Sequence, residues 1–310
     1  MPVLSLRLQI ALAFLSIYTI WGSTYLAIRF AIETFPPFLM AAIRFLIAGG
    51  ALYAWMRLRG AQRPTRANWN AAVIIGGLLL LGGNGGVTKA EQVIPSGLTA
   101  VLITIVPIWM ALVELLQKDR VVPTPQVVLG LVLGFGGVVL LVGPGGLAGS
   151  GGLNPLWVGI LLFASLSWAI GSVYSRKAAL PKTPLLGSGM EMLAGGVLLL
   201  VVSLVSQEWV GFQPSNVSFL SLVSFLYLIV FGSLIAFSSY VWLLTKTTTA
   251  RASTYAYVNP VVAVFLGYFL AGEQLTLRTL LASSMIVIAV VVITTYKSRQ
   301  TVSAKDVSES

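Results

Sequence analysis

Two ionisable residues, Arg44 and Glu191, lie deep within apolar segments of this sequence. Each is about seven residues from one end of its segment, or roughly 10 Å along a helix that rises 1.5 Å per residue. Charged groups at such depth are costly and need a partner or a task. We expect Arg44 to bind a carboxylate and Glu191 to bind an ammonium group or a proton, with both side chains facing one cavity. The alternatives are a structural ion pair, or side chains that each reach back toward the nearer end of the segment.

Uncharged polar and aromatic residues within the segments are further candidates for the wall of this cavity. They are Asn84, Trp109, Trp168, Tyr257 and Asn259. Asn84 stands among glycines that permit close helix approach. An aromatic wall would suit amphipathic molecules and cations, although Trp and Tyr are also common at the ends of membrane-spanning segments. Three further aromatic residues are weaker candidates: Trp21, Tyr25 and Tyr255.

Two prolines, Pro107 and Pro260, fall near the middle of their segments. A proline inside a helix frees the carbonyl four residues earlier and kinks the helix. The freed carbonyls would be those of Ile103 and Ala256. We expect a pair of hinges at these places, with simple packing as the alternative.

The composition indicates where these segments reside. Hydrophobic residues make up 57% of the sequence and charged residues 9%, whereas a soluble domain carries about 25% charged residues. Apolar runs of roughly 20 residues match the helix length that crosses a bilayer. We therefore expect an all-α integral membrane protein with ten transmembrane helices. The expected spans are Leu8–Arg29, Pro37–Met56, Asn70–Thr88, Ser96–Leu116, Pro125–Gly143, Pro155–Ser175, Pro184–Ser206, Phe219–Leu244, Ala252–Ala271 and Thr276–Tyr296.

The basic residues predict how these spans are oriented. If the N-terminus lies inside the cell, most of the 19 Lys and Arg residues fall in the connecting segments on the inner side. Cytoplasmic loops are the ones enriched in Lys and Arg. This places both termini in the cytoplasm, with a polar tail over residues 297–310. We expect the first span to be a retained helix, because its apolar stretch is too long for a signal peptide.

Short motifs recur in the same order in the two halves. Gly22-Ser23-Thr24-Tyr25 recurs as Gly171-Ser172-Val173-Tyr174, Leu46-Ile47-Ala48-Gly49-Gly50 as Met192-Leu193-Ala194-Gly195-Gly196, and Val106-Pro107-Ile108 as Asn259-Pro260-Val261. Each half, 8–143 and 155–296, would hold five spans, so the second half would enter the membrane from the opposite side. Inverted repeats of this kind place a binding site near the midplane and give alternating access.

The motifs also carry a family resemblance over nearly the whole chain. They are Ile20-Trp21-Gly22-Ser23-Thr24-Tyr25, Pro36-Pro37, Arg44-Phe45, Pro95-Ser96-Gly97 and the stretch from Ser253 to Ala263, STYAYVNPVVA. The sequence resembles the EamA branch of the drug/metabolite transporter superfamily, and within it the YedA-type inner-membrane exporters. The resemblance implies ten helices around a central cavity and export of amino acids, related metabolites or amphipathic drugs.

Several other functions are disfavoured. Cysteine and histidine are absent, which removes the commonest metal ligands and general base, so we expect no catalytic residues, no metal and no cofactor. A P-loop is also missing, which disfavours ATP-driven transport. The expected partners are a small-molecule substrate, with proton coupling as one option, and the lipid bilayer, without nucleic acid. A multidrug or quaternary-cation exporter is the alternative, and a non-transporting receptor or scaffold is the alternative from another class.

Overall fold

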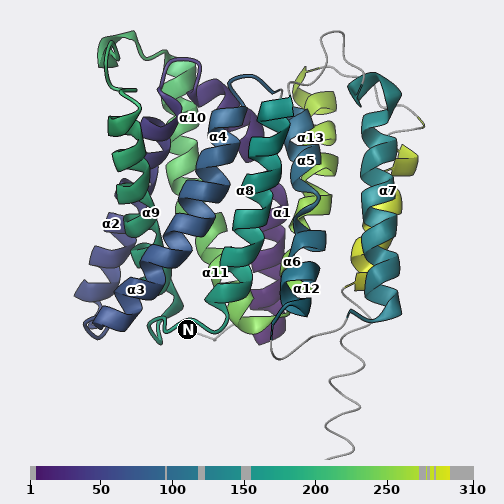
Figure 1. Cartoon of the computed structure of the whole chain (residues 1–310), viewed down its shortest axis with the longest axis horizontal. Coiled ribbons are helices and arrows are strands. Elements are labelled where there is room, and N and C mark those ends of the chain that lie inside the picture. The colour runs from purple at the N-terminus through teal and green to yellow at the C-terminus, as the bar shows by residue number, and fades with distance from the viewer. Residues whose placement is uncertain are drawn as a thin grey trace, which may run out of the picture.

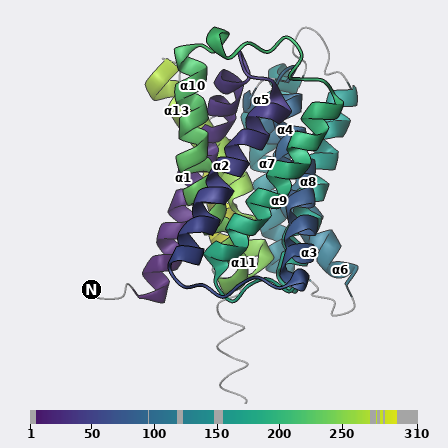
Figure 2. The same cartoon turned by 90° about the vertical axis from the view of Figure 1, so that its left-hand side faces the viewer.

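The computed structural model describes residues 5–94, 96–117, 123–147, 155–271, 277, 280–282 and 284–293, and these contain helices and no strands. The long helices lie side by side with their axes roughly aligned, as the two views in Figures 1 and 2 show. In this description the upper end is the one where α1 ends, as drawn in Figure 1. Residues 297–310 of the expected tail, and parts of the last expected span, lie outside the described residues.

The helices follow one another along the whole chain. They are α1 (Leu6–Ala31), α2 (Pro37–Leu58), α3 (Arg66–Ile75), η1 (Gly76–Gly85), α4 (Gly86–Ala90), α5 (Ser96–Ile103), α6 (Val106–Leu115), α7 (Pro125–Leu147), α8 (Pro155–Ser175), α9 (Pro184–Val205), η2 (Pro214–Asn216), α10 (Phe219–Tyr227), η3 (Leu228–Phe237), α11 (Ser238–Lys246), α12 (Thr249–Ala252) and α13 (Tyr255–Ala271). A further helix, without a label, covers 284–293.

Among the described residues, six helices are long and apolar enough to cross a membrane. They are Leu6–Ala31, Pro37–Leu58, Arg66–Ala90, Pro155–Ser175, Pro184–Val205 and Phe219–Lys246. Three shorter apolar helices, Thr99–Leu115, Pro125–Gly137 and Leu280–Ile293, fall within other expected spans. The membrane-helix prediction is thus confirmed for the long helices, whereas the count of ten stays a prediction.

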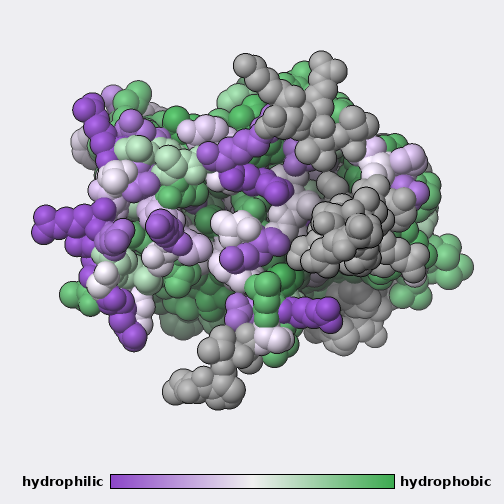
Figure 3. Space-filling model, turned by 90° about the horizontal axis from the view of Figure 1, so that it is seen from below, coloured by the Kyte–Doolittle hydropathy of each residue, from purple (hydrophilic) through white to green (hydrophobic). Residues whose placement is uncertain are grey.

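The surface of the bundle is apolar along its sides and polar over much of its lower end. Large apolar side chains stand exposed on the outer helices, among them Val132 at 64% and Phe163 at 63%, as expected for contact with lipid. Seen from below, hydrophilic side chains spread over much of the lower end, with apolar ones around the rim (Figure 3). The α2–α3 and α8–α9 connections lie at this end, and their exposed basic residues include Arg63 and Lys182.

Two helices from different halves of the sequence, α2 and α9, pack closely because glycines face the contact. A Cβ atom on Gly49 would lie 2.8 Å from the main-chain nitrogen of Leu193. One on Gly76, in η1, would lie 2.6 Å from the main-chain oxygen of Glu191. Small residues allow backbones to approach this closely in membrane helix bundles. This contact fixes α2, α9 and η1 against one another and thereby holds Arg44 in place.

Two of the long helices widen into π-helix near their middle. In Arg66–Ala90 the wide part is η1, and in Phe219–Lys246 it is η3, each ten residues long. Segments of π-helix are rare and often occur at functional sites. Both contribute residues to the cavity described next.

Candidate functional site

The helices enclose a central cavity of about 70 Å³. Its wall comes from α1, α2, η1, α4, α5, α6, α8, η3 and α13, so segments from both halves of the sequence meet there. Several residues singled out by the sequence lie on this wall: Arg44, Asn84, Trp168 and Asn259, and the three weaker candidates Trp21, Tyr25 and Tyr255. The volume has room for a few water molecules, so a larger molecule needs the walls to move apart.

Arg44 is the charged residue of the cavity wall, and 2% of it is exposed. Its Nε donates a hydrogen bond of 2.8 Å to Ser233 Oγ in η3. The guanidinium carbon stands 4.7 Å from the ring centroid of Phe45. Gly232 gives it room, since a Cβ atom there would lie 2.9 Å from Nη2. Nη1 is buried with no hydrogen-bond partner among the described residues, so a donor is left over for a ligand.

Four aromatic rings cluster on the cavity wall and beneath it. The rings belong to Trp21, Trp168, Tyr240 and Tyr255, and Trp21 touches the other three with centroids 4.8–5.5 Å apart. Tyr240 accepts a hydrogen bond of 3.1 Å from Trp168 Nε1 and lies 2.6 Å from Ser172 Oγ. Rings joined in this way form a stiff apolar surface with ring faces that favour cations.

The polar candidates differ in their surroundings. Asn84, in η1, lies on the wall one turn before Thr88, whose hydroxyl donates to the Asn84 main-chain oxygen at 2.8 Å. Asn259, in α13, also lines the wall, and neither polar atom of its amide has a hydrogen-bond partner among the described residues. Both amides can therefore contact a ligand in the cavity.

Two aromatic candidates lie off the cavity wall. Trp109 sits behind it and donates a hydrogen bond of 3.1 Å to Ser165 Oγ, which does line the cavity. The ring of Tyr257 packs against Gly134 of α7, within a separate apolar cluster. Trp109 thus acts on the cavity through Ser165, and Tyr257 faces away from it.

Glu191 is fully buried in α9 but is not among the residues that line the cavity. Neither of its carboxylate oxygens has a hydrogen-bond partner among the described residues, so Arg44 and Glu191 do not pair with each other here. Its main chain packs against Gly76. A role for Glu191 in binding stays a prediction.

The two hinge candidates sit in different local structure. Pro107 follows a break in the expected fourth span, where α5 ends at Ile103 and α6 begins at Val106. Pro260 lies inside the continuous helix α13. The expected ninth span is also broken, but earlier, between α12 and α13.

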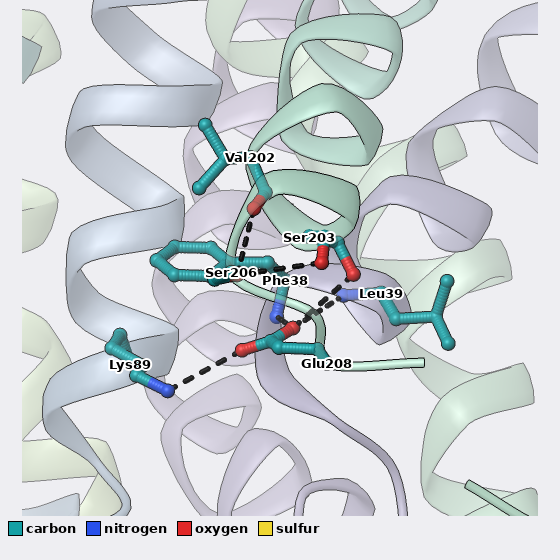
Figure 4. A network of polar contacts seen from close by, with 7 residues as sticks. All are labelled: Phe38, Leu39, Lys89, Val202, Ser203, Ser206 and Glu208. Atoms are coloured by element: carbon teal, nitrogen blue, oxygen red, sulfur yellow. Dashed lines mark hydrogen bonds and ion pairs between the residues drawn. The ribbon is translucent and has the colours of Figure 1, made fainter. Parts of the chain in front are cut away.

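A polar network holds the upper end together, as Figure 4 shows. Glu208, in the α9–α10 connection, accepts hydrogen bonds of 2.8 and 3.1 Å from the main-chain nitrogens of Phe38 and Leu39, at the start of α2. Its other carboxylate oxygen lies 3.3 Å from Lys89 Nζ in α4. We call this network of Glu208, Lys89, Phe38 and Leu39 the upper clasp; it ties α2, α4 and α9 to one another.

Several residues of the site carry little signal in the sequence. Ser233 and Tyr240 position Arg44 and Trp168, yet each is one of several hydroxyl residues in the apolar stretch 219–246 and does not stand out from the others. The Gly232-Ser233 pair is the one available clue, because a glycine next to a hydroxyl residue marks a place where another side chain approaches. The π-helices and the upper clasp leave no such clue.

Comparisons with known proteins agree with this architecture. The EamA-like transporter family matches the chain over residues 8–143 and 155–295. YedA, an uncharacterised inner membrane transporter of Escherichia coli strain K12, is 42% identical over 283 residues, which are 91% of this chain and 89% of YedA. YoaV, an uncharacterised transporter of Bacillus subtilis strain 168, is 26% identical over 289 residues, or 90% of this chain and 94% of YoaV. One solved crystal structure shares the fold, with a TM-score of 0.74 at 21% identity, over 96% of this chain and 99% of that one.

Proposed function

Because the chain belongs to the EamA-like transporter family, we propose that it exports amino acids or related small metabolites, including amphipathic ones, by alternating access. The chain is a multi-pass transporter of the inner membrane. Its family points to transport rather than catalysis. The substrate class, the direction of transport and the alternating-access mechanism are our proposals, and the central cavity supports them.

The observation that carries this proposal is the free donor of Arg44. A buried guanidinium nitrogen without an acceptor is costly, and the carboxylate of a substrate would supply that acceptor in a strong, charge-assisted hydrogen bond. Ser233 and Gly232 hold the guanidinium on the cavity wall. Asn84 and Asn259 would add hydrogen bonds to other polar groups of the substrate.

A second candidate function is export of quaternary amines or other organic cations. The aromatic cluster of Trp21, Trp168, Tyr240 and Tyr255 favours it, since aromatic faces attract cations. The positive charge of Arg44 opposes it, because a lone cation would enter a cavity that already holds one. We therefore rank carboxylate-bearing substrates first.

The architecture that we propose has ten transmembrane helices in two inverted repeats, 8–143 and 155–296, with both termini and the 297–310 tail in the cytoplasm. The two π-helices support it, because η1 falls in the third expected span and η3 in the eighth, five spans apart. Each packs against a helix of the other half: η1 against α9 at Gly76, and η3 against α2 at Arg44. Equivalent helices would thus meet equivalent partners.

Alternating access would use bending of the fourth and ninth spans. Pro107 and Pro260 are the proposed hinges, and the break between α5 and α6 beside Pro107 supports the first of them. Glu191 is the proposed proton carrier, because a buried carboxylate without a hydrogen-bond partner is easily held neutral. Coupling to protons rests on this proposal alone.

Flux into liposomes that contain the purified chain tests the proposal. The panel would hold neutral, acidic and aromatic amino acids, quaternary amines and phosphorylated metabolites, each with and without a proton gradient. We expect saturable flux of amino acids, faster with the gradient. Flux of quaternary amines alone would favour the second candidate, and saturable flux of none of these compounds would contradict transport of both classes.

A further inference from the structure

Glu91, directly after α4 at the upper end, is a buried acid with no role in the site described so far. Its side chain is 0% exposed, and neither carboxylate oxygen has a hydrogen-bond partner among the described residues. Arg29 is its charged neighbour. The Arg29 Nη1 atom, however, donates to the main-chain oxygen of Glu91 at 2.6 Å, and the Arg29 side chain is exposed to solvent. The carboxylate is therefore left without a bonded counter-charge.

Glu91 lies one helical turn beyond the wall of the central cavity and is not itself among the residues that line it. Val87 lines the cavity, and Glu91 follows it by four residues, which places the two on one face of the helix. Tyr25, also on the wall, is close enough to interact electrostatically with Glu91. Lys89, on the same helix, is engaged by Glu208 in the upper clasp.

A buried ionised carboxylate costs several kcal/mol unless a positive charge accompanies it. Among the described residues, Arg29 is the positive charge that acts on this carboxylate, and its hydrogen bond goes to the main chain. A cation that arrives through the cavity would offset this cost. Two sources share that chemistry: the ammonium group of a transported amine, and a coupling proton.

We propose that Glu91 is a cation-binding site at the upper end of the central cavity, which receives the ammonium group of a substrate or a proton. The inference rests on the proposed function, because it places the site on the transport path. It differs from the role proposed for Arg44, which binds the opposite charge deeper in the bundle.

Thermal unfolding of the purified full-length chain in detergent tests the site without need of transport. The variant is Glu91→Gln, which keeps the shape and removes the charge, and the matched control is Glu33→Gln, an exposed acid just after α1. At pH 9 we expect Glu91→Gln to raise Tm by about 2–4 °C, because an ionised carboxylate there has no bonded counter-charge, and Glu33→Gln to leave Tm unchanged. An equal or lower Tm for Glu91→Gln at pH 9 would overturn the proposal, since it would mean that Arg29 already compensates the carboxylate.

The same measurement separates the two sources of positive charge. Propylammonium chloride, against sodium chloride of equal ionic strength, should raise the Tm of the unsubstituted chain and not that of Glu91→Gln if the ligand is an ammonium group. Lower pH should raise the Tm of the unsubstituted chain relative to that of Glu91→Gln if the ligand is a proton. Identical responses of the two chains to both treatments would also overturn the proposal. Absence of flux in liposomes, by contrast, would count against the proposed function and leave the Tm comparison to decide on Glu91.

Discussion

At the scale of single residues, Arg44 is the feature on which the account depends. Its depth in the bundle is set by its place in α2. The hydrogen bond to Ser233 orients its guanidinium group, and Gly232 leaves space for that group. Membrane helices accept a charge at this depth only where it faces a cavity or a partner. Arg44 lies on the cavity wall, and its role in binding stays a prediction.

Removal of the Ser233 hydroxyl should weaken the binding of carboxylate substrates. In Ser233→Ala the Nε atom of Arg44 loses its acceptor, which costs roughly 1–3 kcal/mol, so the guanidinium turns away from its binding position. We expect KM for a transported amino acid to rise about tenfold, with normal expression. Ser233→Thr, which keeps a hydroxyl, should stay close to the unsubstituted chain; equal loss in both variants would mean that Ser233 acts through packing alone.

Most polar candidates reach the cavity wall, with Glu191 as the exception, whereas the aromatic candidates divide between the wall and the layer behind it. Arg44, Asn84 and Asn259 are polar groups in apolar helices, so the cost of burial turns them toward the cavity. Trp109 and Tyr257 carry no such constraint, because an apolar helix that is surrounded by lipid and protein does not reveal which face is inward. Their rings pack behind the wall instead.

At the scale of elements, the wide turns of η1 and η3 explain why faces could not be read from the sequence. A π-helix bonds residue i to i+5 instead of i+4, so ten residues of it shift every later side chain around the helix axis. Nothing in Gly76–Gly85 or Leu228–Phe237 marks this change of period. The upper clasp escapes prediction for a related reason: it depends on the α9–α10 connection, where Gln207 has a φ of 55°.

Loss of the upper clasp should open the cavity at its upper end. Glu208→Gln removes the salt bridge to Lys89 and weakens the hydrogen bonds to the start of α2. The chain has no cysteine, so a single Val87→Cys substitution on the cavity wall can report access to a membrane-impermeant thiol reagent. We expect labelling several times faster with Glu208→Gln than without it, and no change with Glu33→Gln. Equal rates in all three backgrounds would show that the upper clasp does not control access.

Straightening of the fourth span should slow transport more than it weakens binding. Pro107→Ala restores a backbone N–H beside the break between α5 and α6 and favours a continuous helix. We expect the maximal flux to fall about tenfold while KM changes little, as for a conformational step. The control is Pro125→Ala at the first residue of α7, a position where proline is well tolerated. A Pro107→Ala chain with unchanged flux would remove the hinge.

At the scale of the whole molecule, the contrast between apolar sides and a polar lower end agrees with the membrane residence that composition predicts (Figure 3). The repeated motifs predict two halves, and the central contact of α2 with α9 forms where glycines of both halves meet. The sequence could not specify how closely these helices approach, because that depends on which faces the glycines occupy.

Labelling in intact cells tests the proposed orientation. In the cysteine-free chain, Ser215→Cys lies in the exposed α9–α10 connection and Gln62→Cys in the exposed α2–α3 connection. We expect an impermeant thiol reagent to label Ser215→Cys from outside and to reach Gln62→Cys only after the membrane is opened. The reverse pattern would place the termini outside and invert the proposed direction of transport.

The most direct test of the central claim is substrate flux into liposomes for the unsubstituted chain, Arg44→Lys and the exposed-residue control Arg63→Ala. An amino acid that the unsubstituted chain transports would be compared with its methyl ester, which lacks the negative carboxylate. We predict that the unsubstituted chain and Arg63→Ala prefer the amino acid, and that Arg44→Lys loses about tenfold or more in flux for it while its ester flux changes little. Equal preference in all three chains would contradict a carboxylate site at Arg44.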